Sequence, residues 1–239
     1  VRRELTAGAT TFLAMAYITI VNPVILSDAG MDFGAVFVAT CLAAALGTAV
    51  MGLYANYPVA QAPGMGQNAF FTYGIVLGLG YTWQSALGAV FISGLIFIAL
   101  SVLPVREWLI NAIPRSLKLG ISAGIGFFLG IIALSGSGAI VRNDATIVGL
   151  GDLTEAPAMF MLLGFVLIAA LAVRKTTGAV MLGMLLVTAL GWATGVAEFQ
   201  GVFSAPPSLS TLGELDISAA LDLSMITVII TLLLVDVFD

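Results

Sequence analysis

The sequence predicts an all-α polytopic membrane protein, and its composition and length carry that prediction. Of the 239 residues, 60% are hydrophobic and only 9% are charged, whereas a soluble domain carries about 25% charged residues. Lipid can cover such a surface, but water cannot solvate it. Because a spanning helix takes about 20 residues, a chain of this length has room for about seven or eight spans with short loops.

Apolar runs place these spans along the chain. We expect them at residues 6–27, 33–55, 57–79, 82–103, 115–135, 156–173 and 177–196. Residues 197–223 then form a polar linker outside the cytoplasm, and residues 224–239 are the start of an eighth span. We therefore treat residues 1–196 as one seven-span repeat.

Positive charges give the orientation. With a cytoplasmic N-terminus, seven of the eight lysine and arginine residues lie on the inner side, and Arg142 alone lies outside. The positive-inside rule describes this distribution. We expect a multi-pass protein of the inner or plasma membrane, in contact with the lipid bilayer.

An odd number of spans has a topological consequence. A second unit of the same kind would begin on the opposite side of the membrane, which produces an inverted repeat of the kind common in secondary transporters. The eighth span would then be the first helix of the second unit. We expect the chain to be the N-terminal fragment of such a transporter.

The composition also excludes several classes of function. The chain has no histidine, and Cys41 is its single cysteine. Histidine-based catalysis, an intramolecular disulfide and an ordinary zinc site are therefore excluded. No basic patch is present that could bind nucleic acid. We expect a protein that is not an enzyme and that needs no metal or cofactor.

The stretch "NYPVAQAPGMGQNAFFTYG", residues 56–74, interrupts the third span. Pro58 and Pro63 remove amide donors and disfavour helix before them, so "PVAQAP" should be extended and "GMGQNAFFTYGIVLG" a half-length helix. Such a break is tolerated only where protein or a cavity surrounds the backbone. The carboxamides of Gln67 and Asn68 suit a neutral heterocycle. The alternative is a tight loop followed by a mere kink.

Two further predicted spans each have a distinctive face, one polar and one made of glycines. The first has a polar side, whose members we mostly expect to bond to the backbone or to neighbouring helices: Thr10, Thr11, Tyr17, Thr19 and Asn22. The fifth has a face of small residues, for which we expect close helix packing: Gly120, Gly124, Gly126 and Gly130.

The eighth span contains two carboxylates, Asp236 and Asp239. Carboxylates inside a span are costly and usually functional, and burial favours their protonated form. A proton-coupled symporter needs a group of this kind. The alternative is that the helix ends here and both side chains reach water.

These segments together resemble a known family. The segments that carry the resemblance are "TTFLAMAYITIVNPVIL", "APGMGQNAFFTY", "IPRSLKLGISAGIGFFLGIIAL", "SAPPS" and "LLLVDVFD". They are similar to the nucleobase:cation symporter-2 family, the xanthine/uracil permease superfamily, in its AzgA-like branch of hypoxanthine, guanine and adenine permeases. The resemblance covers the first half of a family member and the start of the second.

The resemblance implies a fold of two inverted seven-helix repeats. Residues 1–103 would contribute spans one to four to a core domain, and residues 104–196 would contribute spans five to seven to a gate domain. The third span would contain a short strand followed by a half-helix, and the strand would pair with its counterpart from the second repeat. Family members import purine bases with protons by alternating access, often as homodimers.

The resemblance also implies the site. Asn68 matches the family's purine-binding asparagine, with Gln67 before it and Ala69 after it on the half-helix. Asp239 matches the carboxylate that binds the base and is linked to proton coupling, and Asp236 is the second candidate for that coupling. The coupling ion is the proton, and no cofactor is implied. The family's later glutamate has no counterpart in this chain.

Two other classes of function are left open by the residues. An intramembrane enzyme could use Asp236 and Asp239 as an acid pair on one helix face, although an aspartyl membrane protease needs its acids on two helices. A channel or a transporter of another solute, such as an anion exchanger of related fold, would suit the positive end of a half-helix.

Overall fold

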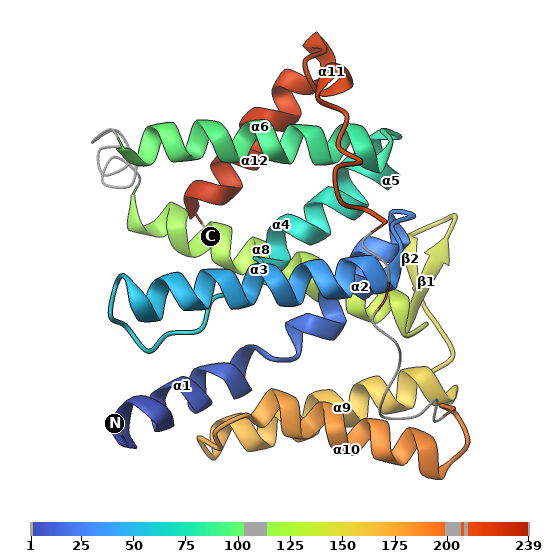
Figure 1. Ribbon diagram of the computed structural model, residues 1–239. Helices are drawn as coiled ribbons and strands as arrows, with labels where there is room; N and C mark the ends of the chain where they lie inside the picture. Colours follow the sequence, from blue (N-terminus) through green and yellow to red (C-terminus); the bar gives the residue numbers. More distant parts are fainter. Residues whose placement is uncertain (1, 103–113, 199–206, 208–209, 239) are drawn as a thin grey trace. The chain divides into compact units, whose positions relative to one another are not determined.

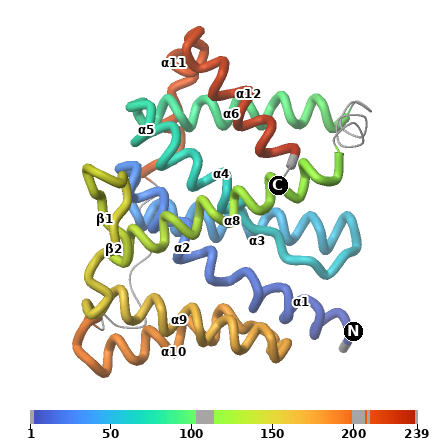
Figure 2. The backbone as a smooth tube through the Cα atoms, turned by 180° about the vertical axis from the view of Figure 1, so that it is seen from behind, coloured from blue at the N-terminus to red at the C-terminus, as the bar shows by residue number. Residues whose placement is uncertain are grey.

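The computed structural model describes residues 2–102, 114–198, 207 and 210–238. The chain forms two compact units, each drawn in Figures 1 and 2. The first unit comprises Val1–Tyr17, Gly47–Gln61 and Phe127–Ala205, and the second comprises Ile18–Leu46, Ala62–Gly126 and Pro206–Asp239. Because two long helices contribute to both units, each unit is built from segments that are distant in sequence.

Most of the described residues are helical. The helices are α1 (Arg2–Met15), α2 (Ile18–Asp28), α3 (Phe33–Leu53), α4 (Met65–Ala69), α5 (Leu77–Leu79), α6 (Trp83–Val102), α8 (Arg115–Gly136), α9 (Ala156–Val173), α10 (Ala179–Ala193), α11 (Ile217–Ala220) and α12 (Ile226–Phe238). A π-helical segment, η1 (Phe70–Val76), joins α4 to α5, and a 3-10 turn, η2 (Leu223–Met225), precedes α12.

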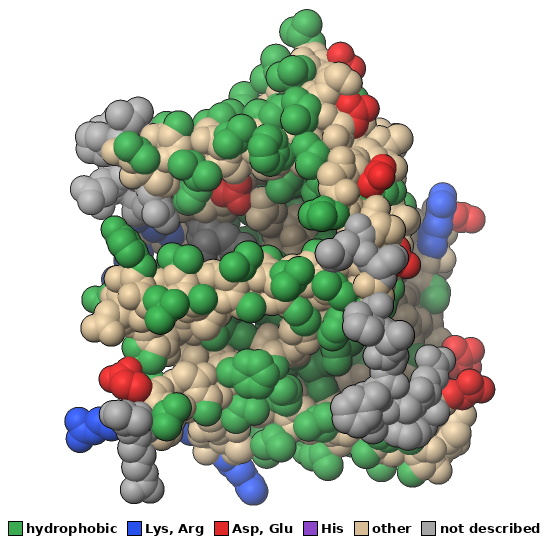
Figure 3. Space-filling view, viewed as in Figure 1, with side chains coloured by type: hydrophobic (Ala, Val, Ile, Leu, Met, Phe, Trp, Pro, Cys, Tyr) green, Lys and Arg blue, Asp and Glu red, His purple; other side chains and the backbone are tan. Residues whose placement is uncertain are grey.

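Several helices have the length and composition of membrane spans. Five stretches of the described chain qualify: Arg3–Asp28, Phe33–Leu53, Trp83–Val102, Arg115–Gly136 and Ala156–Val173. Hydrophobic side chains are spread over the helices on the face in Figure 3, and charged side chains are few. The prediction of a mostly helical membrane protein is therefore confirmed. The predicted seventh span is shorter than expected, because α10 begins after Gly178, which has a left-handed φ of 73°, and ends at Ala193, just before Gly195 with a left-handed φ of 72°.

Helices α9 and α10 pack against each other in the first unit, and α1 contacts α10. Glycines make this approach possible. A Cβ added at Gly164 would lie 3.1 Å from a methyl carbon of Val187, and one added at Gly183 would clash with Ile168. Small residues at such contacts let helix backbones come close in a membrane, where packing drives association.

The glycine face of α8 has no such packing. A Cβ added at any of its four members would meet no atom within 4 Å among the described residues: Gly120, Gly124, Gly126 and Gly130. The expectation of close helix packing at this face is therefore wrong for the part of the chain that the structure describes. Small residues permit a close approach but do not by themselves supply a partner.

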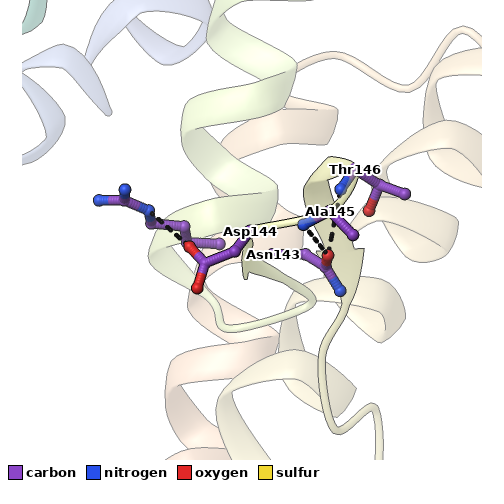
Figure 4. A network of polar contacts seen from close by, with 5 residues as sticks. Asn143, Asp144, Ala145 and Thr146 are labelled. Atoms are coloured by element: carbon purple, nitrogen blue, oxygen red, sulfur yellow. Dashed lines mark hydrogen bonds and ion pairs between the residues drawn. The ribbon is translucent and has the colours of Figure 1, made fainter.

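A hairpin that the sequence did not predict follows α8. Strands β1 (Ile140–Asn143) and β2 (Ile147–Leu150) pair antiparallel, with Arg142 opposite Val148. Figure 4 shows its turn, where the side-chain oxygen of Asn143 accepts hydrogen bonds from the amides of Ala145 and Thr146 at 2.9 and 3.1 Å. This is an Asx-type turn. The adjacent Arg142–Asp144 ion pair is exposed, so it contributes about 0–1 kcal/mol.

The second unit has a hydrophobic core between α6, η1 and α12. Its larger members include Val36, Phe71, Ile75, Met225, Val228, Ile229 and Leu232. The segment before α12 also packs on α6, where the amide of Asp216 donates to the carbonyl of Gln84 at 3.0 Å. Asp216 caps α11, and hydrogen bonds from the Ser218 hydroxyl and the Ala219 amide lower the pKa of its carboxyl.

The interruption follows the end of α3 at Leu53, and Asn56 within it has a left-handed φ of 56°. Asparagine tolerates this conformation better than most residues. Residues 56–64 then carry no regular secondary structure, and no strand pairing is assigned to them within the described residues. The helix that follows starts at Met65.

Two threonine hydroxyls satisfy part of this irregular backbone. In the first unit, the amide of Ala60 donates to Oγ1 of Thr11 at 3.3 Å, and the amide of Gln61 donates to Oγ1 of Thr48 at 2.9 Å. The Thr48 hydroxyl lies 3.4 Å from the carbonyl of Gln61, to which it donates in turn. A Cβ added at Gly47 would lie only 3.1 Å from the Cβ of Gln61, so glycine permits this approach.

Removing the Thr48 hydroxyl should therefore destabilise the fold. Thr48→Val removes the acceptor of the exposed Gln61 amide, and the loss of one such hydrogen bond costs about 0.5–1.5 kcal/mol. We expect a lower apparent melting temperature of the detergent-purified protein, followed by fluorescence-detected gel filtration. Thr10→Val is the matched control, because the Thr10 hydroxyl donates to the Thr6 carbonyl of its own helix and to no other described residue. Equal losses in both variants would contradict the role assigned to Thr48.

Candidate functional site

The candidate site is built on one continuous helical stretch, residues 65–79, that lies within the range predicted for the third span. It begins after Gly64, which is extended at φ −71° and ψ 121° and has no side chain to cap the helix. It ends at Gly80, whose left-handed φ of 77° is the usual helix-stopping conformation of glycine. Between these ends, α4 presents Gln67 and Asn68 in and just after its first turn.

The middle of this stretch is π-helical. Seven residues, Phe70–Val76, adopt the wider turn, which is rare and is frequently found at functional sites. The hydroxyl of Thr72 lies here, and among the described residues it is a buried side-chain oxygen without a hydrogen-bond partner. Tyr73, next to it, donates to Oδ2 of Asp28 at 2.6 Å. This bond ties η1 to the end of α2.

Three polar side chains form a network that holds Asn68 in place. The Asn68 amide Nδ2 donates to Oδ1 of Asn22 at 2.5 Å, and Nδ2 of Asn22 donates to Oγ1 of Thr40 at 2.8 Å. The Thr40 hydroxyl donates onward to the carbonyl of Val36 at 2.7 Å. We call Asn68, Asn22 and Thr40 the carboxamide network. It links α4, α2 and α3 within the second unit.

Burial fixes which groups of the carboxamide network donate hydrogen bonds and which accept them. Asn22 is only 4% exposed and Thr40 only 3%, and buried polar groups are costly unless they are hydrogen-bonded. Each group in the network therefore has a defined role as donor or acceptor. Asn68 itself is half-buried and uses one amide hydrogen in this way. Its carboxamide oxygen makes no hydrogen bond within the described part of the chain, so it remains available to a ligand.

A second polar contact joins α6 and α12. The hydroxyl of Ser93 donates to Oδ2 of Asp236 at 2.9 Å. Ser93 is fully buried and Asp236 is half-buried. Helix α12 packs against both α6 and α4. The carboxylate and the carboxamides are thus carried by helices in direct contact.

The predicted site residues have the following positions. Gln67 and Asn68 are half-buried on α4, and Ala69 is fully buried where α4 meets η1. Gln67 makes no side-chain hydrogen bond to any described residue. Asp236 is on α12, and Asp239 lies outside the described residues. The structure brings Asn68 together with Asn22, as expected for a polar residue of the first span.

Sequence reasoning missed Thr40 and Ser93 altogether. Each is a single hydroxyl in a long apolar run, and such residues usually bond to their own helix. The only signal in the sequence was weak. Each hydroxyl stands alone in an apolar span, while a carboxamide or carboxylate in another span needs a hydrogen-bond partner. Their partners lie 18 and 143 residues away in sequence.

Comparisons with known proteins agree on one family. A sequence model described as "Permease family" matches residues 2–239. A protein named as a permease from Methanocaldococcus jannaschii is 50% identical over 238 residues, which are 99% of this chain and 55% of that protein. The adenine permease AdeP of Escherichia coli is 46% identical, over 100% of this chain and 54% of its own length.

A third relative has a different purine in its name. The guanine/hypoxanthine permease PbuG of Bacillus subtilis is 44% identical over 251 residues, covering 100% of this chain and 57% of that protein. The chain therefore spans about half the length of the curated relatives it matches.

The carboxamide network can be tested by its effect on folding. Asn22→Ala leaves the amide of Asn68 and the hydroxyl of Thr40 without their partner, which should cost about 1–3 kcal/mol. We expect a lower melting temperature and less folded protein in the membrane fraction. Asn143→Ala, in the exposed hairpin turn, is the control for loss of an asparagine. A melting temperature for Asn22→Ala equal to that of the unaltered protein would show that the network does not hold α4.

Proposed function

The chain belongs to the xanthine/uracil permease family, as its motifs indicated, and from this membership we propose that it forms the N-terminal half of a purine nucleobase importer. The names of its relatives support purines as substrates, since one is an adenine permease and another a guanine/hypoxanthine permease. The proposed importer uses alternating access and is driven by proton symport. On this proposal the protein is a transporter and not an enzyme.

The observation that carries this proposal is that the Asn68 carboxamide has its oxygen and one amide hydrogen available for a ligand. A purine edge presents a ring N–H donor beside a ring nitrogen or carbonyl acceptor. A carboxamide matches such an edge, because its oxygen accepts and its N–H donates. Asn22 holds one hydrogen of Asn68, which leaves the oxygen and the second hydrogen for the base. Gln67 supplies a second carboxamide in the same helical turn.

The remaining site residues complete this picture. Ala69 lies fully buried on the same short helix and would follow Asn68 at the tip of the half-helix, as the family resemblance implies. Asp239 would accept a hydrogen bond from the purine and take part in proton coupling, as the family resemblance implies. Asp236 is the second candidate for coupling. The wild-type assembly would contain the second inverted repeat and, as in other family members, would form a homodimer.

The irregular segment before α4 also supports the proposal. In the proposed fold it is the short strand of the third span, and it would pair with the corresponding strand of the second repeat. Residues 1–103 would then belong to the core domain and residues 104–196 to the gate domain. Transport would follow from movement of one domain against the other, with the base held beside the half-helix.

Uptake measurements test the role of Asn68. In cells without their own purine transporters, a complete permease carrying this sequence should accumulate labelled adenine, guanine or hypoxanthine. Asn68→Ala removes two hydrogen bonds to the base, so the uptake efficiency should fall about tenfold or more. Asn143→Ala should leave uptake unchanged. Full uptake by Asn68→Ala at normal membrane levels would refute the site, and uptake of uracil or an anion alone would refute the substrate class.

Proton coupling needs a separate measurement. Collapse of the proton gradient by an uncoupler should abolish net accumulation, because no other driving ion is proposed. Exchange of internal labelled base for external unlabelled base should persist, because exchange requires no net driving force. Replacement of sodium by choline is the control and should have no effect. Accumulation that survives the uncoupler but is lost in choline would replace the proton by sodium.

A further inference from the structure

The hydroxyl of Thr40 fixes the direction of the carboxamide network from one end. A hydroxyl has a single hydrogen, and Thr40 donates it to the carbonyl of Val36, which can only accept. Toward Asn22 the Thr40 oxygen can therefore only accept, so the Asn22 atom that lies 2.8 Å from it must be the amide nitrogen. Because Thr40 and Asn22 are both buried, each depends on protein partners.

This direction passes through Asn22 to Asn68. With its nitrogen turned to Thr40, Asn22 offers its other polar atom, the oxygen Oδ1, to Asn68. That oxygen can only accept, so Asn68 must turn its own amide nitrogen toward it. The Asn68 oxygen then lies on the other side of the carboxamide. Three side chains on α3, α2 and α4 thus select one of the two orientations of the Asn68 carboxamide.

This orientation matters because purines differ at the edge that a carboxamide would read. Adenine has an amino group at C6, which donates, beside the ring nitrogen N1, which accepts. Hypoxanthine and guanine have a carbonyl at C6, which accepts, beside an N1–H group, which donates. The order of donor and acceptor is therefore reversed. For a base held in one pose, one orientation of a carboxamide pairs with 6-aminopurines and the flipped orientation pairs with 6-oxopurines.

We propose that Asn22 and Thr40 determine specificity: by fixing the orientation of Asn68, they set the preference of the permease between 6-aminopurines and 6-oxopurines. The proposal rests on the proposed function, in which Asn68 contacts the base. Asn22 and Thr40 act through Asn68 and are positioning residues. The names of two relatives differ along the same line, since one is an adenine permease and the other a guanine/hypoxanthine permease.

A competition assay measures this preference. In the complete permease, uptake of the labelled base that accumulates faster, adenine or hypoxanthine, would be inhibited by each unlabelled base in turn. The ratio of the two inhibition constants does not depend on the amount of protein in the membrane. The unaltered permease should prefer one base about tenfold or more, because the other meets donor against donor and acceptor against acceptor.

The variant Thr40→Val should remove most of this preference. Without the hydroxyl, one polar group of Asn22 is unpaired in either orientation, while the other still pairs with Asn68. Both orientations of the two carboxamides are then populated, so the ratio should fall to within about threefold of one. If Thr40→Val does not reach the membrane, Thr40→Cys decides the outcome. Its thiol is a weaker donor and acceptor, so the ratio should fall less but in the same direction.

Two controls separate positioning from general disruption. Thr40→Ser keeps the hydroxyl and should keep the ratio of the unaltered permease. Thr231→Val makes the same change on α12, where the hydroxyl donates to the carbonyl of Thr227 in its own helix at 2.8 Å. Because Thr40 makes the same kind of bond to Val36, this control accounts for the loss of an intrahelical bond. It should leave the ratio unchanged.

Each result has a defined meaning. An unchanged ratio in Thr40→Val and Thr40→Cys, or a ratio near one in the unaltered permease, would overturn the inference while leaving the proposed transport intact. An equal fall in Thr231→Val or in Thr40→Ser would also overturn it, because neither change alters the direction of the network. Absence of purine uptake by the unaltered permease would overturn the proposed function, and the inference with it.

Discussion

The arrangement depends on one constraint: a backbone that leaves helical geometry inside a membrane must still find hydrogen-bond partners. Residues 56–64 lie between α3 and α4 without regular secondary structure, and in the predicted third span lipid would offer their amides and carbonyls no partner. The hydroxyls of Thr11 and Thr48 supply partners to Ala60 and Gln61, and Gly47 gives the room for this approach. The irregular segment is therefore stabilised by hydrogen bonds and space that neighbouring helices provide. The helix at residues 65–79 follows it directly.

The same constraint explains why the site is made of amides and hydroxyls. Once α4 begins inside the second unit, its polar side chains need partners there as well. Asn22 and Thr40 meet this need for Asn68, and Ser93 meets part of it for Asp236. Each of these contacts also restricts the orientation of a side chain that we propose to handle base or proton. The same hydrogen bonds therefore satisfy buried polar groups and orient the side chains of the proposed binding site.

The sequence predicts the helices well and their contacts poorly, for physical reasons. Runs such as Phe33–Leu53 and Trp83–Val102 stand out because apolar length determines a span. The partner of Asn22 or Ser93 depends on which helices pack together, and that is not local information. The sequence did not predict the hairpin at Ile140–Leu150, because its strands are short and mostly exposed. The π-helical turn of Phe70–Val76 has no residue signature, so the backbone alone reveals it.

The threonine contacts also bear on how such a protein is made. In the proposed fold of two repeats, a ribosome would deliver the first repeat before the second, so for a time residues 56–64 would have no partner strand. In the described structure, hydroxyls from α1 and α3 already hold residues 60 and 61 without strand pairing. Both helices precede the break in the chain and are present when it enters the membrane. The interruption can thus take its shape during synthesis, from parts that have already been inserted.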